Sequence, residues 1–409
     1  MRGETILRVD GLCTRFFTKT GQINAVESLS FDVAEREVFG IVGESGSGKS
    51  VTARSLIGLI ESPGRITDGS IEYRNAELAD ELRDQYPDAV DGAFVDLVSV
   101  PEAVQQSLRG PAFSMIFQDP ESSFNPSLTV GEQIAEAVEV QRRASANPRS
   151  VKARTKSSEY SLRSYLTGAI MPRRGYVSSE SKEKAVDLLD QVGIPDPEQR
   201  VDEYPHEYSG GMLQRAMIAQ ALAGEPDILI ADEPTTALDV TIQAQVLNLL
   251  DELQEETGMT IVLITHNLGV IARMCDRVGV MYAGEIVERG TLEDVFDSPV
   301  HPYTQGLLGS IPDLDSAGGR LQPIAGNVPS LLDREMGDRC YFADRCPKAM
   351  EECLTKPPEF GGEGSDEHRV KCYLADRGYD PAKALDGSHF DTTGPTEAGE
   401  PERAEVEEQ

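Results

Sequence analysis

The sequence predicts an α/β fold with a parallel sheet, and three observations lead to it. A glycine-rich run at 43–50 stands between an apolar run at 38–42 and a helix-like run at 51–60. Two later apolar runs, 228–231 and 260–264, end in polar residues. Buried parallel strands have this apolar character, and open α/β sheets bind ligands at the carboxyl ends of such strands.

The glycine-rich run has the pattern of a phosphate-binding loop, Gly43-Glu44-Ser45-Gly46-Ser47-Gly48-Lys49-Ser50. Glycines let backbone amides turn toward an anion, and the start of the following helix adds positive partial charge. We expect Lys49 to reach the outer phosphates and the Ser50 hydroxyl to bind Mg²⁺. The pattern predicts a nucleoside triphosphate site and leaves open what the triphosphate drives.

Composition narrows the class of protein. The chain has 409 residues, enough for two or three domains, and a net charge of −32. Such a surface repels nucleic acid and anionic lipid, and it fits either adaptation to concentrated salt or an ordinary acidic soluble protein. No apolar stretch reaches the roughly 20 residues of a membrane span, and residues 1–10 are too polar for a signal peptide. We therefore expect a cytosolic protein with reduced thiols.

The N-terminal part of the chain is expected to form short strands at 6–9, 25–33 and 68–73. Between the first two lie Phe16 and Phe17, and an aromatic residue there can stack on an adenine ring or pack into a core. Residues 75–108 are acidic and show no motif, so we expect a loop there.

The middle of the chain combines a strand that ends in Gln118 with two helical patterns, at 128–140 and 185–192. Between the helices, residues 141–175 hold nine basic residues and a single acid, Glu159. This basic insertion is either a solvated flexible segment or a patch that faces lipid headgroups or an acidic partner.

Three patterns in the second half can carry chemistry. Ser209-Gly210-Gly211 opens a helix, and a helix N-terminus of this kind can bind an anion. An apolar strand ends in Asp232 and Glu233, of which the first can hold Mg²⁺ and the second can polarise a water for attack on a γ-phosphate. Another strand ends in His266, at the sheet edge where ligands bind.

Taken together, these patterns resemble the ABC-type ATPase cassettes over residues 5 to about 300. The resemblance rests on the order and spacing of the phosphate loop, Gln118, Ser209-Gly210-Gly211-Met212-Leu213-Gln214, Asp232-Glu233, Ala237-Leu238-Asp239 and His266. It implies a P-loop NTPase fold, in which a RecA-like core carries an antiparallel β subdomain and, at about 128–205, a helical subdomain.

The resemblance also implies that two cassettes pair head to tail around ATP. The phosphate loop of one subunit would face Ser209, Gly210, Gly211 and Gln214 of the other, and Asp239 would contact the opposite cassette. Phe17 is the better match to the adenine-stacking aromatic, with its neighbour Phe16 as the alternative.

For catalysis, the resemblance implies that Glu233 activates water, that His266 holds the γ-phosphate and that Gln118 senses the γ-phosphate and Mg²⁺. The implied ligands of Mg²⁺ are Ser50, Gln118 and Asp232.

Residues 298–375 resemble the C-terminal extension of dipeptide and oligopeptide permease ATP-binding subunits. The matching segments are 298–308 and 324–329, and Ala325 stands where that family usually has proline. The segment contains Cys340, Cys346, Cys353 and Cys372. Four thiols in a short cytosolic segment favour a metal centre over disulfides, while their spacing leaves zinc, an iron–sulfur cluster and free thiols open. The resemblance favours a structural [4Fe–4S] cluster.

We therefore predict a cassette at 1–297, an extension at 298–375 and an acidic tail at 376–409 that is expected to be disordered. The chain would be the ATP-hydrolysing subunit of a membrane importer for dipeptides, oligopeptides or related solutes, on the cytoplasmic face of the membrane. Its partners would be a second cassette, expected to be a different homologous chain, two transmembrane permease subunits and, indirectly, an extracellular solute-binding protein. The alternative is a soluble ABC ATPase that acts on nucleic acid or ribosomes, but the chain has neither a second cassette nor a heptad run.

Overall fold

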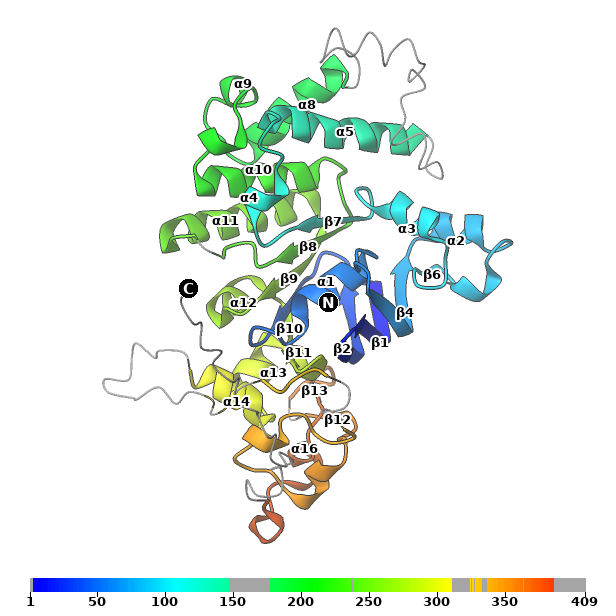
Figure 1. The fold of residues 1–409 in the computed structure, drawn as a ribbon, viewed down its shortest axis with the longest axis vertical. Coiled ribbons are helices and arrows are strands. Elements are labelled where there is room, and N and C mark those ends of the chain that lie inside the picture. Colours follow the sequence, from blue (N-terminus) through cyan, green and yellow to red (C-terminus); the bar gives the residue numbers. More distant parts are fainter. Residues whose placement is uncertain are drawn as a thin grey trace, which may run out of the picture.

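The computed structural model describes residues 3–146, 177–236, 238–310, 324, 326, 328–332, 337–362 and 364–385. Figure 1 shows an elongated molecule in which two sheets lie between a group of helices at one end and the C-terminal segment at the other. In this described part of the chain, we find no helix with the length and apolar character that a membrane crossing requires.

The larger sheet has eight strands in the order β12-β13-β11-β10-β3-β9-β8-β7. Its parallel part consists of β10 (Arg277–Tyr282), β3 (Val38–Val42), β9 (Thr260–Thr265), β8 (Ile228–Asp232) and β7 (Phe113–Ile116). Antiparallel strands complete it: β11 (Glu285–Thr291), β13 (Arg369–Val370) and β12 (Phe360–Gly361).

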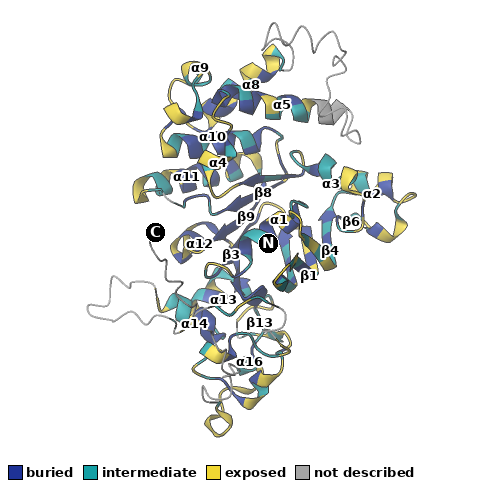
Figure 2. Cartoon of the chain, viewed as in Figure 1, coloured by how far each residue is buried: buried dark blue, intermediate teal, exposed yellow. Residues whose placement is uncertain are grey.

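The register of the parallel strands brings their carboxyl ends to one edge. Val42 of β3 pairs with Thr265 of β9, and Asp232 of β8 pairs with Ile264 of β9. The residues that follow these strands are therefore neighbours, although they are far apart in the sequence. Every residue of β3, β8 and β9 is buried, which Figure 2 shows as dark blue, and this explains their continuous apolar runs.

The smaller sheet is antiparallel, in the order β2-β1-β4-β6-β5. Its strands are β1 (Thr5–Thr18), β2 (Gly21–Ala34), β4 (Gly64–Arg74), β5 (Val90–Asp91) and β6 (Phe94–Asp96). It shares a hydrophobic cluster with one face of the larger sheet, which includes Leu7, Phe31, Phe39 and Ile41. The Tyr73 hydroxyl also donates a hydrogen bond to Asp227, just before β8.

The expectation of a loop at 75–108 is wrong. The segment contains α2 (Ala76–Leu82), a short turn η1 (Pro87–Ala89), strands β5 and β6, and α3 (Glu102–Leu108). Asn75 caps α2 by accepting a hydrogen bond from the backbone amide of Leu78 at 2.9 Å, and Ala79 and Leu82 are buried. The acidic residues between these two buried positions hid the helical pattern, because they lie on the solvent side.

The helices form at both sides of the larger sheet. The structure contains α1 (Lys49–Leu56), α4 (Pro120–Ser123), α5 (Val130–Ala146), α8 (Ser179–Gln191), α9 (Pro197–Arg200), η2 (Pro205–Glu207), α10 (Gly210–Leu222), α11 (Val240–Thr257) and α12 (Leu268–Met274). Both predicted helices in the middle of the chain occur, as α5 and α8.

The helices α5 and α8 are joined by Glu139, whose buried carboxylate accepts hydrogen bonds from the Ser178 and Ser181 hydroxyls at 3.0 and 2.7 Å. Most of the basic insertion at 141–175 lies outside the described residues.

The C-terminal segment attaches to the antiparallel edge of the larger sheet. Its helical pieces are α13 (Leu292–Asp297), α14 (Pro302–Leu308), η3 (Ala343–Arg345), η4 (Glu351–Leu354), α16 (Leu374–Arg377) and η5 (Pro381–Lys383). The His368 imidazole lies 2.9 Å from the Glu288 carboxylate, and both side chains are fully buried. This polar contact joins the hairpin β12–β13 to β11.

Part of the predicted acidic tail is structured. Residues 376–385 contain the end of α16 and the turn η5, and the Leu385 amide donates to the Ala349 carbonyl at 2.9 Å. Disorder is therefore the wrong expectation for these ten residues, because they pair with the segment before them. The rest of the tail lies outside the described residues.

Candidate nucleotide site

The loop at 43–50 connects β3 to α1 at the sheet edge described above. Gly43 and Gly48 have no room for a side chain: an added Cβ would lie 2.1 Å from the Met281 carbonyl oxygen and 2.2 Å from the Ala25 carbonyl oxygen, respectively. Gly48 also has a φ of 103°, which disfavours other residues. The Ser47 hydroxyl is buried, and none of the described residues offers it a hydrogen bond. The loop is thus shaped by close backbone packing and keeps an unused polar group.

Lys49 folds back along the loop. Its ammonium group donates to the carbonyl oxygens of Gly43 at 2.9 Å and Glu44 at 3.0 Å. Burial lowers the pKa of Lys49, while the nearby carboxylates of Glu233, Asp232 and Glu44 act in the opposite direction. A buried cation at the mouth of an amide-lined loop is placed to attract phosphate oxygens.

Ser50 and Asp232 form the first pair of oxygen donors at the site. The Ser50 hydroxyl donates to the Asp232 carboxylate at 3.0 Å, although the two residues are 182 positions apart. Burial raises the pKa of Asp232, and the hydrogen bond from Ser50 opposes that rise. Hydroxyl and carboxylate oxygens are the ligands that Mg²⁺ prefers, so the donor set fits this ion.

Glu233 gathers three polar side chains from three segments. Its carboxylate accepts hydrogen bonds from the Gln118 amide at 3.1 Å and from the Thr236 hydroxyl at 2.8 Å. The His266 imidazole lies 3.1 Å from the same carboxylate through Nδ1. The structure therefore brings together all three of the predicted catalytic residues, next to the Ser50–Asp232 pair.

The backbone conformation and the pKa of Glu233 both depart from their ordinary values. Its φ is 51°, a left-handed conformation that is uncommon for a residue other than glycine. Burial alone would raise the pKa of Glu233, but the hydrogen bonds from His266 and Thr236 outweigh it, so the pKa is lowered. The carboxylate is consequently ionised at neutral pH, as a water-polarising group must be.

The predicted Ser209-Gly210-Gly211 segment starts α10. The Ser209 hydroxyl accepts a hydrogen bond from the Met212 amide at 3.3 Å, and both Ser209 and Gly210 are exposed. Further along, Gln214 is buried with an unpartnered side-chain nitrogen. α10 packs on α4, α5, α8, α11 and β7, whereas α1 packs on β1, β2, β8 and β9. In the described part of the chain, the helix start and the phosphate loop therefore belong to elements with different main packing partners.

The contacts that Phe17 and Asp239 make are with residues outside the loop. Phe17 is exposed, and the Arg65 guanidinium lies 4.4 Å from the centre of its ring, while Phe16 packs against Gly64. Asp239 caps α11 by accepting hydrogen bonds from the amides of Thr241 and Ile242, each at 3.0 Å. Ala237, two residues before Asp239, lies outside the described residues.

The four cysteines of the extension lie near one another as free thiols. The Cys340 amide donates to the Cys353 carbonyl at 3.1 Å, and Cys353 and Cys372 are buried. Burial raises the pKa of Cys372 to about 12 and that of Cys346 to about 11, with further contributions from neighbouring thiols. Across the described ranges, however, no three His, Cys, Asp or Glu side chains are arranged as a metal-binding group.

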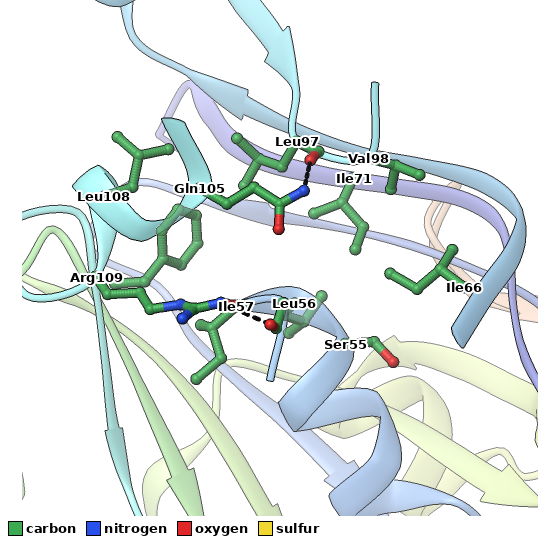
Figure 3. Close-up of a pocket in the computed structure, with 12 residues that line it drawn as sticks. Ser55, Leu56, Ile57, Ile66, Ile71, Leu97, Val98, Gln105, Leu108 and Arg109 are labelled. Atoms are coloured by element: carbon green, nitrogen blue, oxygen red, sulfur yellow. Dashed lines mark hydrogen bonds between the residues drawn. The ribbon is translucent and has the colours of Figure 1, made fainter. Parts of the chain in front are cut away.

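A small apolar cavity lies apart from these residues. Figure 3 shows it between Ile57 at the end of α1, Ile66 and Ile71 of β4, and Gln105 of α3. Its volume of about 20 Å³ is close to that of a single water molecule, so it is too small for a nucleotide. It is closed by Arg109, which donates to the Ile57 carbonyl at 3.0 Å, and by Gln105, which donates to the Leu97 carbonyl at 2.6 Å.

Sequence reasoning missed three residues around the site. Thr236 holds Glu233, and its only signal is its position three residues later in the same loop. Tyr303 and Arg345 both contact Glu44, from segments that the sequence links only to the extension.

Comparison with known families gives two matches. Residues 26–236 match the model of the ABC transporter family, and residues 287–353 match the model described as oligopeptide/dipeptide transporter, C-terminal region. The first match covers the phosphate loop, Gln118, Ser209-Gly210-Gly211 and Asp232-Glu233, and the second covers Tyr303 and Arg345.

Curated relatives match over most of the chain. It is 42% identical to a dipeptide transport ATP-binding protein of Bacillus subtilis, covering 91% of this chain and 96% of the relative. It is likewise 42% identical to a dipeptide transport ATP-binding protein of Haemophilus influenzae, covering 90% and 95%. An oligopeptide transport ATP-binding protein of Bacillus subtilis is also 42% identical, covering 91% and 97%.

Solved structures support the fold. A nucleotide-free ATP-binding cassette from an ABC transporter superposes with a TM-score of 0.51 at 20% identity, covering 74% of this chain and 98% of that one. A cassette from Clostridium perfringens, part of the cbiONQ transporter complex, gives a TM-score of 0.50 at 22% identity, covering 72% and 92%. The predicted α/β cassette fold is confirmed.

Proposed function

Because the chain belongs to the ABC transporter family of ATP-binding cassettes, we propose that it hydrolyses ATP to energise a membrane importer of dipeptides or oligopeptides. The observation that carries the proposal is the convergence of Gln118, Glu233 and His266 beside the Ser50–Asp232 pair. The names of the relatives and the match to the oligopeptide/dipeptide C-terminal region support peptides as the solute.

The phosphate loop would bind the β- and γ-phosphates of ATP through its amides, the Ser47 hydroxyl and Lys49. These amides would come from residues Gly43 to Gly48, whose backbone would surround the phosphates. Ser50 and Asp232 would hold Mg²⁺, with Gln118 as a further oxygen ligand. When bound, Mg²⁺ offsets the negative charge of the phosphates.

Glu233 would orient and polarise the water that attacks the γ-phosphate. Thr236 and His266 support this role because they hold the carboxylate and keep it ionised. His266 would then contact the γ-phosphate, and Gln118 would leave Glu233 to reach the nucleotide. In that way Gln118, two residues after the end of β7, would report the state of the nucleotide to the helices that follow it.

We propose that a complete site needs two cassettes. The exposed Ser209-Gly210-Gly211 turn would bind the γ-phosphate held by the opposite subunit, with Gln214 supporting the turn from below. Phe17 would stack on the adenine ring, and Asp239 would contact the opposite cassette. The exposure of Ser209 and Gly210 is compatible with this arrangement, since the turn is accessible to an opposite cassette. The second cassette would be a different homologous chain.

The remaining partners would be two transmembrane permease subunits and, through them, an extracellular solute-binding protein. A groove of about 930 Å³ beside Gln118 supports a docking site for a permease segment. It is lined by Phe117, which is 38% exposed, and by Met217 and Gln220 of α10. The chain would then sit on the cytoplasmic face of the membrane, with the basic insertion at 141–175 toward lipid or an acidic partner. The net charge of −32 would suit a salt-rich interior, where screening weakens self-repulsion.

We also propose that Cys340, Cys346, Cys353 and Cys372 hold a structural [4Fe–4S] cluster, with zinc as the alternative. Their proximity, their free state and the amides of Phe342, Lys348 and Leu374 near three of the sulfurs support thiolate ligation. Anaerobic purification followed by absorption spectroscopy and metal analysis separates the choices. A broad visible absorption band together with iron and sulfide supports the cluster; zinc without iron supports the alternative, and absence of both metals refutes either centre.

Reconstitution tests the proposed function. The chain would be co-purified with its permease subunits, placed in vesicles with ATP on the cassette side, and supplied with solute-binding protein and a labelled dipeptide. We expect uptake that depends on ATP and stops in the Lys49→Ala variant. ATP hydrolysis stimulated by RNA or ribosomes, without peptide uptake or permease association, would instead support the soluble alternative.

A further inference from the structure

Glu44, the second residue of the phosphate loop, makes hydrogen bonds through its carbonyl, its amide and its carboxylate. Its carbonyl accepts from Lys49 at 3.0 Å, which belongs to the loop itself. Its amide donates to the Tyr303 hydroxyl at 2.9 Å, and its carboxylate accepts both terminal nitrogens of Arg345 at 2.9 and 3.1 Å. Two of the three contacts thus come from residues about 260 and 300 positions downstream.

The Arg345 side chain is built into the protein rather than lying on its surface. Only 7% of it is exposed, compared with 27% of the Glu44 side chain. The guanidinium also donates to the Tyr282 hydroxyl at 3.3 Å and lies over the rings of Tyr282 and Phe342 at 5.7 and 5.8 Å. Tyr303 packs against both of these rings, with centroids 4.6 and 5.5 Å apart. The aromatic rings of Tyr282, Tyr303 and Phe342 therefore hold the guanidinium group of Arg345 next to the loop.

We propose that Arg345 is a positioning residue for nucleotide binding, which it supports through the carboxylate of Glu44. This inference rests on the proposed function, in which the loop binds ATP. A bidentate guanidinium–carboxylate pair fixes both the distance and the plane of the carboxylate. Together with the Tyr303 hydroxyl, the pair anchors the loop at Glu44, which precedes Gly46 and Gly48. The C-terminal segment thereby contributes to the nucleotide site without touching the nucleotide.

The pair also has an electrostatic consequence. Glu44 places a negative charge in the loop that must accept a polyphosphate, and like charges at short range repel. Arg345 neutralises this carboxylate and holds it away from the loop amides. Without Arg345, the bare carboxylate would compete with phosphate for those amides and for Lys49. The loss should therefore depend on the charge of Glu44, and this dependence separates positioning from a general role in stability.

The test measures ADP binding to the full-length chain by titration calorimetry and ATP turnover by the assembled complex. Arg345→Ala should weaken ADP binding by about 10-fold, as expected for a charged hydrogen-bonded pair. It should raise KM for ATP by a similar factor and leave kcat within about twofold, because Arg345 does not touch the reacting atoms. The matched control is Arg339→Ala, which removes an ion pair with Asp344 in the same segment and should leave both values unchanged.

A double variant makes the inference specific. Glu44→Gln alone should weaken ADP binding by about threefold, because it breaks the bidentate pair without leaving a bare carboxylate in the loop, and Glu44→Gln with Arg345→Ala should be no weaker than Glu44→Gln. A double variant as weak as Arg345→Ala, or an Arg345→Ala variant with wild-type affinity, would overturn the proposal. Should Arg345→Ala fail to fold, Arg345→Gln replaces it with the same expected pattern and the same refuting outcomes. A wild-type chain that binds no ADP would refute the proposed function itself, which is a different result.

Discussion

Replacing Glu233 with glutamine is the perturbation that isolates the proposed chemistry. Glutamine has nearly the same size, so it can occupy the place of a carboxylate that contacts Gln118, Thr236 and His266. The amide can still accept a hydrogen bond from Thr236. What it loses is the negative charge of Glu233, whose pKa lies below its ordinary value because of the hydrogen bonds from His266 and Thr236. Nucleotide binding should therefore survive, because the loop, Lys49 and the Ser50–Asp232 pair are untouched.

The expected magnitude follows from the role of the carboxylate. A positioned base contributes about 100- to 10,000-fold to a rate, which corresponds to about 3–5 kcal/mol of transition-state stabilisation. The Glu233→Gln variant should lose turnover by a factor in this range, while its dissociation constant for ATP should stay within about threefold. The turnover of Thr236→Val should lie between that of the wild type and that of Glu233→Gln, since the variant loses one of the hydrogen bonds that hold the carboxylate but keeps its charge.

The assay is phosphate release by the assembled complex at saturating ATP, together with calorimetric titration of ATP into each variant. Glu256→Gln is the matched control, because Glu256 is an exposed residue of α11 away from the sheet edge. It should retain wild-type turnover. A Glu233→Gln variant with undiminished turnover would refute the assignment of the base, and one that no longer binds ATP would show that Glu233 shapes the site rather than the chemistry.

Three further perturbations test the loop and the C-terminal segment. Lys49→Ala should weaken ATP binding by about 10- to 100-fold, since it removes a charged hydrogen-bond donor to phosphate; unchanged calorimetric affinity would contradict this. Gly43→Ala should cost about 1–3 kcal/mol of unfolding free energy, because its Cβ would lie 2.1 Å from the Met281 carbonyl oxygen; an unchanged urea midpoint would argue against the packing. Burial lowers the pKa of His301 to about 4, from an ordinary 6.5, so protonation favours the unfolded chain and stability should fall as pH drops through that window. Urea unfolding should show about 2 kcal/mol more loss between pH 7 and pH 5 in the wild type than in His301→Asn, and an equal loss in both would exclude this source.

Local patterns in the sequence were sufficient to predict those strands in which every residue is buried. The buried strands β3, β8 and β9 were predicted because both faces of each are covered, so the apolar runs are unbroken. The order of those strands along the sheet was not available from local patterns. The convergence of Gln118, Glu233 and His266 was foreseen only through resemblance to a family.

The parts that escaped prediction depend on contacts between distant segments. Arg345 lies 301 positions from Glu44, and nothing near either residue signals the pair. In α2, acidic residues on the solvent face concealed a helix whose buried side consists only of Ala79 and Leu82. The Ser47 hydroxyl and the side-chain nitrogen of Gln214 lack a hydrogen-bond partner among the described residues only because of how the chain packs around them. Burial and pairing of this kind depend on tertiary contacts, so a short stretch of sequence does not predict them.

The claim that two cassettes share each nucleotide is tested most directly by an electron cryo-microscopy map of the importer trapped with ATP by Glu233→Gln. We expect Ser209 Oγ and the Gly211 amide of this chain within hydrogen-bonding distance of a γ-phosphate held by the loop of the partner cassette. The phosphate in this chain's own loop should meet the corresponding turn of that partner. An ATP-loaded complex in which the Ser209-Gly210-Gly211 turn lies far from every phosphate would contradict the shared site.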